Sequence, residues 1–128
     1  MRRARGENLE LTLAPWHSGT IVRMLAYRNI ARMGDYVEAL AQAAASGARP
    51  NISPDDRDGR RKYGVTVSAE QPLADVGECG AFLRLGWNDG ATESFAFTEV
   101  DRHLSLGGQL SGVHWGRTDD RVGAASAR

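Results

Sequence analysis

The residues best suited to nucleophilic or metal chemistry stand at spacings that fit neither kind of site. The histidines, His17, His103 and His114, never form the close His-x-x-x-His pair with which a helix holds zinc. Ser105 and Ser111 lack the glycine frame of a nucleophile elbow, in which a sharp turn exposes the serine hydroxyl. The sequence therefore predicts no zinc-dependent or serine-dependent active site.

Three weaker signals fail for similar reasons. Residues 55–59, Asp-Asp-Arg-Asp-Gly, are similar to the start of a calcium loop, but no glutamate closes the coordination at the twelfth position. The pair Gly107-Gly108 lacks the third glycine and the strand-to-helix context of a dinucleotide site. Cys79 is the single cysteine, which excludes a disulfide framework and a paired-thiol metal site. We therefore expect no enzyme, no cofactor and no metal.

The composition excludes two further classes of protein. Sixteen basic and sixteen acidic residues among 128 give a formal net charge of zero, so the basic excess of a nucleic-acid binder is missing. The best apolar run, residues 21–27, is broken by Arg23 and is far shorter than the roughly 20 residues of a spanning helix. The charged start, residues 1–6, has no apolar segment behind it and is no secretory signal. A membrane protein built of β-barrel strands is not excluded, because such strands alternate polar and apolar residues.

The elements that must position any functional side chain are mostly strands. Apolar and polar residues alternate with period 2 through much of the chain, which is the pattern of a sheet with two unlike faces. The alternation is imperfect in residues 20–31, the second of the segments that it predicts to be strands. The alternation predicts strands over residues 9–13, 20–31, 63–70, 81–88 and 103–110, with a last short strand through 122–124.

One segment breaks this pattern and predicts a helix over residues 36–45. Asp35 can cap its N-terminus, and Glu38 stands at the reciprocal spacing of a capping box. Gly47 supplies the stop. The polar residues 46–61 that follow are expected to form an exposed loop.

The connections between the predicted strands alternate in length. Those at residues 15–19, 74–77 and 113–119 are short, whereas those at 34–61 and 88–102 are long. Outer-membrane barrels have short turns at one end and long loops at the other. A soluble antiparallel meander can show the same alternation, so both architectures stay open on this ground.

Four segments together resemble the carbohydrate-selective porins of the OprB family. They are residues 29–40 (NIARMGDYVEAL), 62–64 (KYG), 85–102 (LGWNDGATESFAFTEVDR) and 114–123 (HWGRTDDRVG). The resemblance covers residues 11–125 and is most specific in the third segment. Two positions depart from the family pattern: Thr118 stands where proline is common, and Cys79 is unusual.

The resemblance implies an all-β fold: an antiparallel meander of five to six strands that forms part of a transmembrane β-barrel. Residues 1–128 would make a single partial barrel domain, with one short helix in the long loop 34–61. Family members are several times longer and begin with a secretion signal, so we expect the chain to correspond to an interior fragment of such a barrel. The implied location is the outer membrane of a Gram-negative bacterium.

In a barrel wall the alternation gains a meaning, because one side of each strand faces lipid and the other faces the lumen. An arginine facing mid-bilayer lipid costs about 2–4 kcal/mol, so Arg84 fixes the orientation of its strand. The predicted lipid-facing residues are Val65, Val67, Leu83, Leu85, Trp87, Leu104, Leu106 and Leu110. The predicted lumen-facing residues are Thr66, Glu70, Arg84, Asn88, Ser105 and Gln109.

The resemblance also implies passive diffusion of sugars through a water-filled pore, with weak binding, because tight binding would slow release. Trp87 or Trp115 could anchor the membrane interface. The alternative for residues 99–102 is an ion-paired loop without a role in selectivity. The predicted pore-lining residues are Arg23, Tyr27, Arg84, Asn88, Glu99, Asp101, Arg102 and Gln109.

The expected partners are carbohydrates and outer-membrane lipid, with no nucleic acid, and a homotrimer follows by analogy with porins generally. Two alternatives remain on the sequence alone. One is a small soluble β-domain that binds a partner or ligand, and the other is a fragment with no function of its own.

Overall fold

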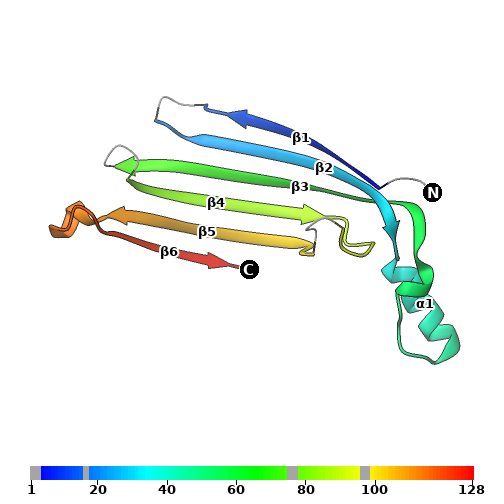
Figure 1. Cartoon of the computed structure of the whole chain (residues 1–128). Coiled ribbons are helices and arrows are strands. Elements are labelled where there is room, and N and C mark those ends of the chain that lie inside the picture. The colour runs from blue at the N-terminus through cyan, green and yellow to red at the C-terminus, as the bar shows by residue number, and fades with distance from the viewer. Residues whose placement is uncertain (1–3, 16–17, 75–77, 96–98) are drawn as a thin grey trace. The chain divides into compact units, whose positions relative to one another are not determined.

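The fold is a six-stranded antiparallel sheet in which the strands follow one another in chain order (Figure 1). This computed structural model describes residues 4–15, 18–74, 78–95 and 99–128. The strands are β1 (Arg5–Leu13), β2 (Ile21–Met33), β3 (Arg57–Ala74), β4 (Cys79–Asn88), β5 (Arg102–Ser111) and β6 (Arg121–Ala127). The predicted all-β meander with one helix is confirmed.

The sheet is open. Its strand order runs from β1 to β6, and within the described ranges these two edge strands are not hydrogen-bonded to each other. The described part of the chain also contains no helix of the length and apolarity that crossing a membrane would require. The predicted turn residues 16–17 and 75–77 lie outside the described residues.

The chain comprises two compact units. The first, here the loop unit, consists of Met1–Leu9, Ala26–Val65 and Trp87–Asp101. The second, here the strand unit, consists of Glu10–Leu25, Thr66–Gly86 and Arg102–Arg128. Strands β1 to β4 contribute residues to both units, whereas β5 and β6 belong to the strand unit alone.

The helix of the loop unit, α1 (Tyr36–Ser46), begins and ends where its capping residues require. The Asp35 carboxylate accepts the backbone N–H groups of Val37 at 2.9 Å and Glu38 at 3.1 Å, which satisfies donors that a helix start leaves free. Gly47 ends the helix in the left-handed region, with φ of 68°. The predicted helix is confirmed, but its capping box is only half formed, because the Glu38 carboxylate binds Arg57 and Arg60 instead.

The same ion pairs explain why β3 begins at Arg57, inside the segment predicted to be loop. Arg60 reaches Asp35 at 3.0 Å and Glu38 at 2.7 Å, and its side chain is only 13% exposed. Asp55 is buried and accepts a hydrogen bond from the Gln42 side chain. The prediction of an exposed loop over 46–61 is therefore wrong for residues 57–61, because charges on the helix hold the start of the strand.

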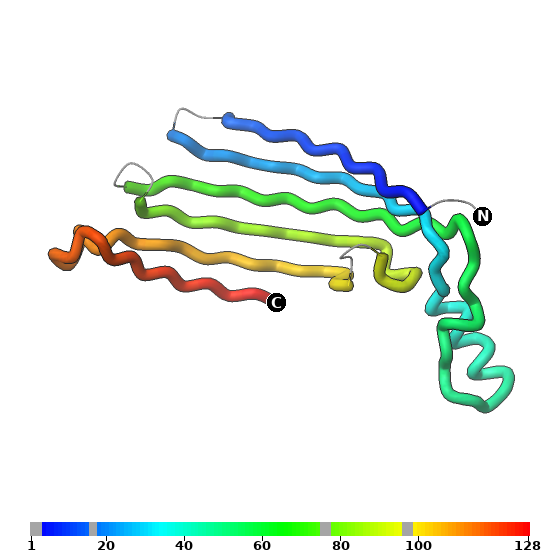
Figure 2. The backbone as a smooth tube through the Cα atoms, in the orientation of Figure 1, coloured from blue at the N-terminus to red at the C-terminus, as the bar shows by residue number. Residues whose placement is uncertain are grey.

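The strand unit has one apolar side. Residues of this side alternate along each strand with the polar residues of the other side, and all of them are substantially exposed. Strands β5 and β6 run side by side (Figure 2), and Leu110 is paired with Val122, so the two residues lie on the same side of the sheet. We call this set the leucine side; it comprises Leu11, Leu13, Met24, Val67, Leu83, Leu85, Leu104, Leu106, Leu110 and Val122.

Very little of the chain is buried as a conventional core. Among the described residues the buried apolar side chains are Ala31, Met33, Ala39 and Cys79. A water-soluble domain buries most of its large apolar side chains, whereas here every leucine except Leu25 is 40–74% exposed. Such a sheet needs an apolar environment for the leucine side.

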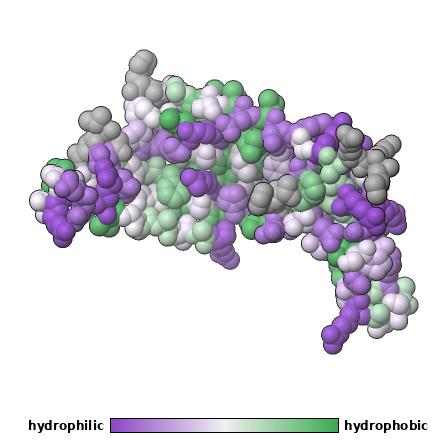
Figure 3. Space-filling view, viewed as in Figure 1, coloured by the Kyte–Doolittle hydropathy of each residue, from purple (hydrophilic) through white to green (hydrophobic). Residues whose placement is uncertain are grey.

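The turn between β5 and β6 is short and polar. It contains a single 3-10 turn (Gly112–Trp115), and Arg117 binds Asp120 at 2.7 Å. In Figure 3 this turn, at the left end of the view, is covered mainly by hydrophilic residues. The Arg117 N–H donates to the Gly112 carbonyl, and the Gly112 N–H donates to the Asp120 carbonyl, so the turn closes on itself.

Replacing Gly112 with alanine is expected to open this turn. A Cβ at this position would lie 1.9 Å from the Arg117 carbonyl oxygen and 2.7 Å from that of Asp120. Backbone atoms cannot step aside as a flexible side chain does, so we expect a loss of about 2 kcal/mol. Urea titration of the refolded protein in detergent measures it. Gly123→Ala is the control, since its Cβ would make only one ordinary contact, at 3.4 Å; equal stability of the two variants would contradict the prediction.

Candidate functional site

The strand unit contains a concave hollow of about 590 Å³, which falls within the size range of small-molecule sites. Two of the predicted pore-lining residues, Arg84 and Gln109, line it. They come from β4 and β5, neighbouring strands of the sheet. Its other lining residues are Gly19, Ile21, Glu70, Gln71, Pro72, Gly80, Ala81, Phe82, Gly108, Gly123, Ala124 and Ala125.

A smaller hollow of about 290 Å³ adjoins the same side chains. Its lining residues are Arg23, Thr66, Val67, Ser68, Glu70, Arg84, Leu85 and His103. Arg23 and Glu70 form an ion pair of 2.7 Å from β2 to β3. The four strands β2 to β5 thus bring charged and hydroxyl-bearing residues to one side, which we call the polar side.

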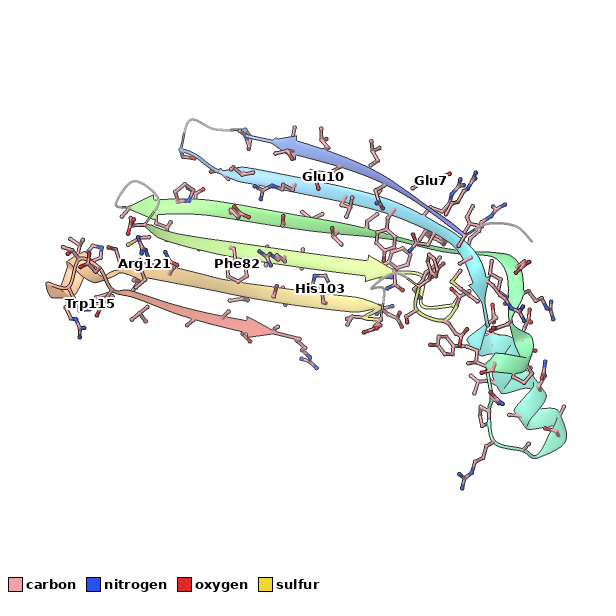
Figure 4. All side chains as sticks on the ribbon, in the orientation of Figure 1. Glu7, Glu10, Phe82, His103, Trp115 and Arg121 are labelled. Atoms are coloured by element: carbon pink, nitrogen blue, oxygen red, sulfur yellow. The ribbon has the colours of Figure 1, made fainter. Side chains whose placement is uncertain are left out.

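Rings on the polar side lie over glycines of the neighbouring strand. A Cβ at Gly107 would be 2.7 Å from the Phe82 ring, and one at Gly86 would be 2.1 Å from the His103 ring. Glycine in a strand leaves exposed backbone that an aromatic ring on the adjacent strand can cover. Phe82 and His103, labelled in Figure 4, therefore hold fixed positions on β4 and β5.

Arg84 is the cation of the polar side that has no acidic partner among the described residues. Its guanidinium carbon lies 5.2 Å from the centre of the Phe82 ring, which is a cation–π distance. Arg84 itself is exposed. The arrangement therefore presents an oriented guanidinium, next to an aromatic ring, to whatever enters the hollow.

The loop unit holds a second group of polar residues, built around a buried lysine. Lys62 is 1% exposed, and its ammonium group donates to the Thr92 carbonyl at 3.0 Å. The carboxylates of Asp89 and Asp101 lie 4.0 and 3.8 Å from the same nitrogen. This charge cluster ties β3 to the segment that follows β4.

The segment after β4 is fixed by hydrogen bonds at both ends. The Asn88 side chain donates to the Val100 carbonyl at 2.9 Å and accepts the Gly90 N–H at 2.9 Å, as the predicted Asn-Asp-Gly turn requires. The Glu93 carboxylate accepts the Gly34 N–H at 2.8 Å, ahead of α1. These bonds attach the described residues 89–95 and 99–101 to the rest of the loop unit.

The structure separates the predicted pore-lining residues into three groups. Arg23, Arg84 and Gln109 belong to the polar side of the strand unit. Tyr27, Asn88 and Asp101 belong to the loop unit, where Tyr27 bonds to Asn88 and its ring lies over Gly64. Glu99 is exposed in the segment after β4, and Arg102 lies on the side of β5 that carries Leu104.

The ion pairing around residues 99–102 differs from that expected for the alternative of an ion-paired loop. No ion pair joins Glu99 to Arg102 in the described residues, and Asp101 approaches Lys62 instead. Sequence reasoning missed Lys62 and Phe82 as functional neighbours. Glycines on the polar side of neighbouring strands are the signal that could have located Phe82, and the presence of one lysine among fifteen arginines could have marked Lys62.

Exposed aromatic side chains also lie within β3, near the end of β4 and in the turn after β5. Tyr63 and Trp87 meet edge to face, with centroids 5.9 Å apart, and both are exposed. Trp115, in the turn after β5, is 42% exposed (Figure 4). Outer-membrane barrels carry such girdles where the apolar band meets the headgroups.

Three of the residues considered for catalysis or metal binding, Cys79, Ser111 and His114, lie together in the strand unit. Cys79 is buried, and its sulfur accepts the Ser111 N–H at 3.2 Å and lies 3.5 Å from His114 Nε2. Among the described residues no three potential ligands gather to hold a metal ion. His17 lies outside the described residues.

The comparisons with known proteins agree with this geometry. The profile of the carbohydrate-selective porin, OprB family, matches residues 14–128. No curated protein and no solved structure matches the chain. The match spans every strand but β1, and porins are channels of the outer membrane rather than enzymes. The chain therefore belongs to the OprB family of carbohydrate-selective porins.

Proposed function

We propose that the polar side lines a water-filled pore through which sugars diffuse passively across the outer membrane of a Gram-negative bacterium. The observation that carries the proposal is that the strand unit has the leucine side on one face and the polar side on the other. Exposed leucines occupy one side, and the hollow with Arg84, Phe82 and Gln109 opens on polar residues of the other. A barrel wall requires this division, because its outer side meets lipid and its inner side meets water.

We further propose that the sheet is an arc of a larger barrel. Its edge strands, β1 and β6, are not bonded to each other, and an open edge cannot remain unpaired in hydrocarbon. Additional strands that pair with both edges would close the wall. Trimeric association, known for porins generally, is part of this proposal by analogy.

The pore-lining residues have distinct parts in the proposed function. Arg23, Arg84 and Gln109 offer hydrogen-bond donors and acceptors to sugar hydroxyls, and the Phe82 ring offers a face to sugar C–H groups. Tyr27, Asn88 and Asp101 belong to the loop unit, where they hold the segment after β4. Glu99, exposed where this segment leads into β5, is proposed to meet sugar there, whereas Arg102, on the side of β5 that carries Leu104, is left out of the proposed pore lining.

Swelling of liposomes that contain the protein, as isolated from the outer membrane, tests the function. We expect swelling in iso-osmotic arabinose or glucose and much slower swelling in a trisaccharide, because a pore discriminates by size. Protein-free liposomes are the control. Swelling no faster than the control would overturn the proposal, as would a soluble monomer that unfolds cooperatively without detergent, the behaviour of a small soluble β-domain.

A further inference from the structure

The hollow of the strand unit carries an unbalanced positive charge. Glu70 and Arg84 are the ionisable residues among those that line it. Glu70 is bound to Arg23 at 2.7 Å, so its charge is already compensated. Arg84 has no carboxylate within ion-pair distance in the described part of the chain, and its neighbour is the ring of Phe82.

The Phe82 ring restricts the position of the Arg84 side chain. The Phe82 ring lies over Gly107, where a Cβ would be 2.7 Å away, and the guanidinium lies 5.2 Å from the ring centre. A ring held in this way keeps the planar guanidinium from sampling many orientations, which lowers the entropy lost on binding. A guanidinium fork matches the two oxygens of a carboxylate, or two oxygens of a phosphate.

Uncharged hydrogen-bonding groups stand in the same hollow. Gln109 donates through Nε2 to the Glu78 carbonyl at 3.1 Å, which leaves its side-chain oxygen as an acceptor. Gly80 and Gly123 line the hollow without side chains. The hollow thus combines one anion-binding group, an aromatic ring and an acceptor for hydroxyl groups, in a volume of about 590 Å³.

We propose that this hollow is a subsite for anionic monosaccharides, with the sugar carboxylate of a hexuronate bound by the Arg84 guanidinium. The inference rests on the proposed pore, and it adds a substrate class to the polar side. The sugar ring lies beside Phe82, and a hydroxyl donates to Gln109. Binding is weak, as passage through a pore requires.

Equilibrium binding to the full chain in a polyoxyethylene detergent, followed by ligand-observed NMR, tests the proposal. The probes are glucose, glucuronate and glucose 6-phosphate. We expect glucuronate to bind roughly fivefold more tightly than glucose, the size of a well-placed exposed charge contact, and the difference to shrink at high salt. Preference for glucose 6-phosphate as well would support an anion subsite; preference for neither anion would overturn it.

Variants assign the effect to one residue. Arg84→Gln is expected to bring glucuronate to the affinity of glucose, whereas Arg84→Lys keeps the charge, loses the fork and retains part of the preference. Arg117→Gln is the matched control, because it removes the same charge from an ion pair with Asp120 in the turn after β5. An unchanged preference in Arg84→Gln, or its loss in Arg117→Gln, would contradict the proposal. If Arg84→Gln does not fold, the salt dependence of the unaltered chain still tests whether the preference is electrostatic, and Arg84→Lys still tests whether it needs the guanidinium fork.

The two proposals fail separately. Swelling of liposomes in glucose, with equal binding of glucose and glucuronate, leaves the pore standing and removes the anionic subsite. Absence of swelling together with a glucuronate preference that depends on Arg84 does the reverse.

Discussion

Replacing Lys62 with methionine is expected to destabilise the loop unit by about 3 kcal/mol. Methionine fills a similar volume but carries no charge, so Asp89 and Asp101 lose the ammonium group that lies 4.0 and 3.8 Å from them. The Thr92 carbonyl loses its donor as well. Removing one partner of a buried ion pair costs roughly 3–5 kcal/mol, and the exposure of Asp101, 56%, places this case at the lower end.

The loss of stability should be local, because the Lys62 side chain contacts residues of the segment after β4. Thr92 is also bridged to Asp35, and Glu93 is bonded to Gly34, so without the lysine the segment keeps these bonds to the start of α1 but loses the contacts of the Lys62 side chain from β3. Glutamyl endopeptidase cleaves after glutamate and reports opening around Glu93. We expect faster cleavage there in Lys62→Met than in the unaltered protein, in proportion to the population of the open state.

Arg61→Met supplies the control. Arg61 is the neighbour of Lys62 in β3 and is exposed, so the same substitution removes one positive charge without emptying a buried cluster. We expect its cleavage rate to stay near that of the unaltered protein. Equal acceleration in both variants would show that net charge, and not the buried cluster, holds the segment.

The strands were predictable because each has one apolar and one polar side. The two sides produce an alternation of apolar and polar residues that can be recognised in the sequence. Leu83, Leu85 and Trp87 place β4, and Leu104, Leu106 and Leu110 place β5. The helix was predictable for another local reason, the capping residue Asp35 and the stop at Gly47. The alternation of a strand and the capping of a helix depend on residues close together in the chain, so a single sequence is enough to reveal both.

The candidate site was less predictable, because its defining contacts join different strands. The burial of Lys62 depends on Thr92 and Asp101, which are distant in the chain. The start of β3 at Arg57 depends on Glu38 in α1, and a run of polar residues gives no hint of it. Phe82 acquires its place from Gly107 on the next strand. Such pairs require the register between strands, which alternation alone does not supply.

The largest effect expected in the strand unit is that of Leu85→Arg. Leu85 belongs to the leucine side and is 43% exposed, so water would tolerate an arginine there without cost. If lipid meets this side, the arginine must lie against hydrocarbon, which costs about 2–4 kcal/mol near the midplane. We therefore expect a loss of folding stability of that size in liposomes, measured by urea titration with the folded band on unheated gels as the readout.

Thr66→Arg is the matched variant. Thr66 lines the smaller hollow on the polar side, so the same new charge would face the water of the lumen and should change stability by less than about 1 kcal/mol. The contrast between the two variants measures which side of the wall meets lipid. A soluble sheet would show no excess cost at Leu85, because arginine there would remain in water, whereas Arg23 and Arg84 lie near Thr66 in either case. Equal stabilities, or the reversed order, would therefore remove the membrane orientation on which the proposed pore depends.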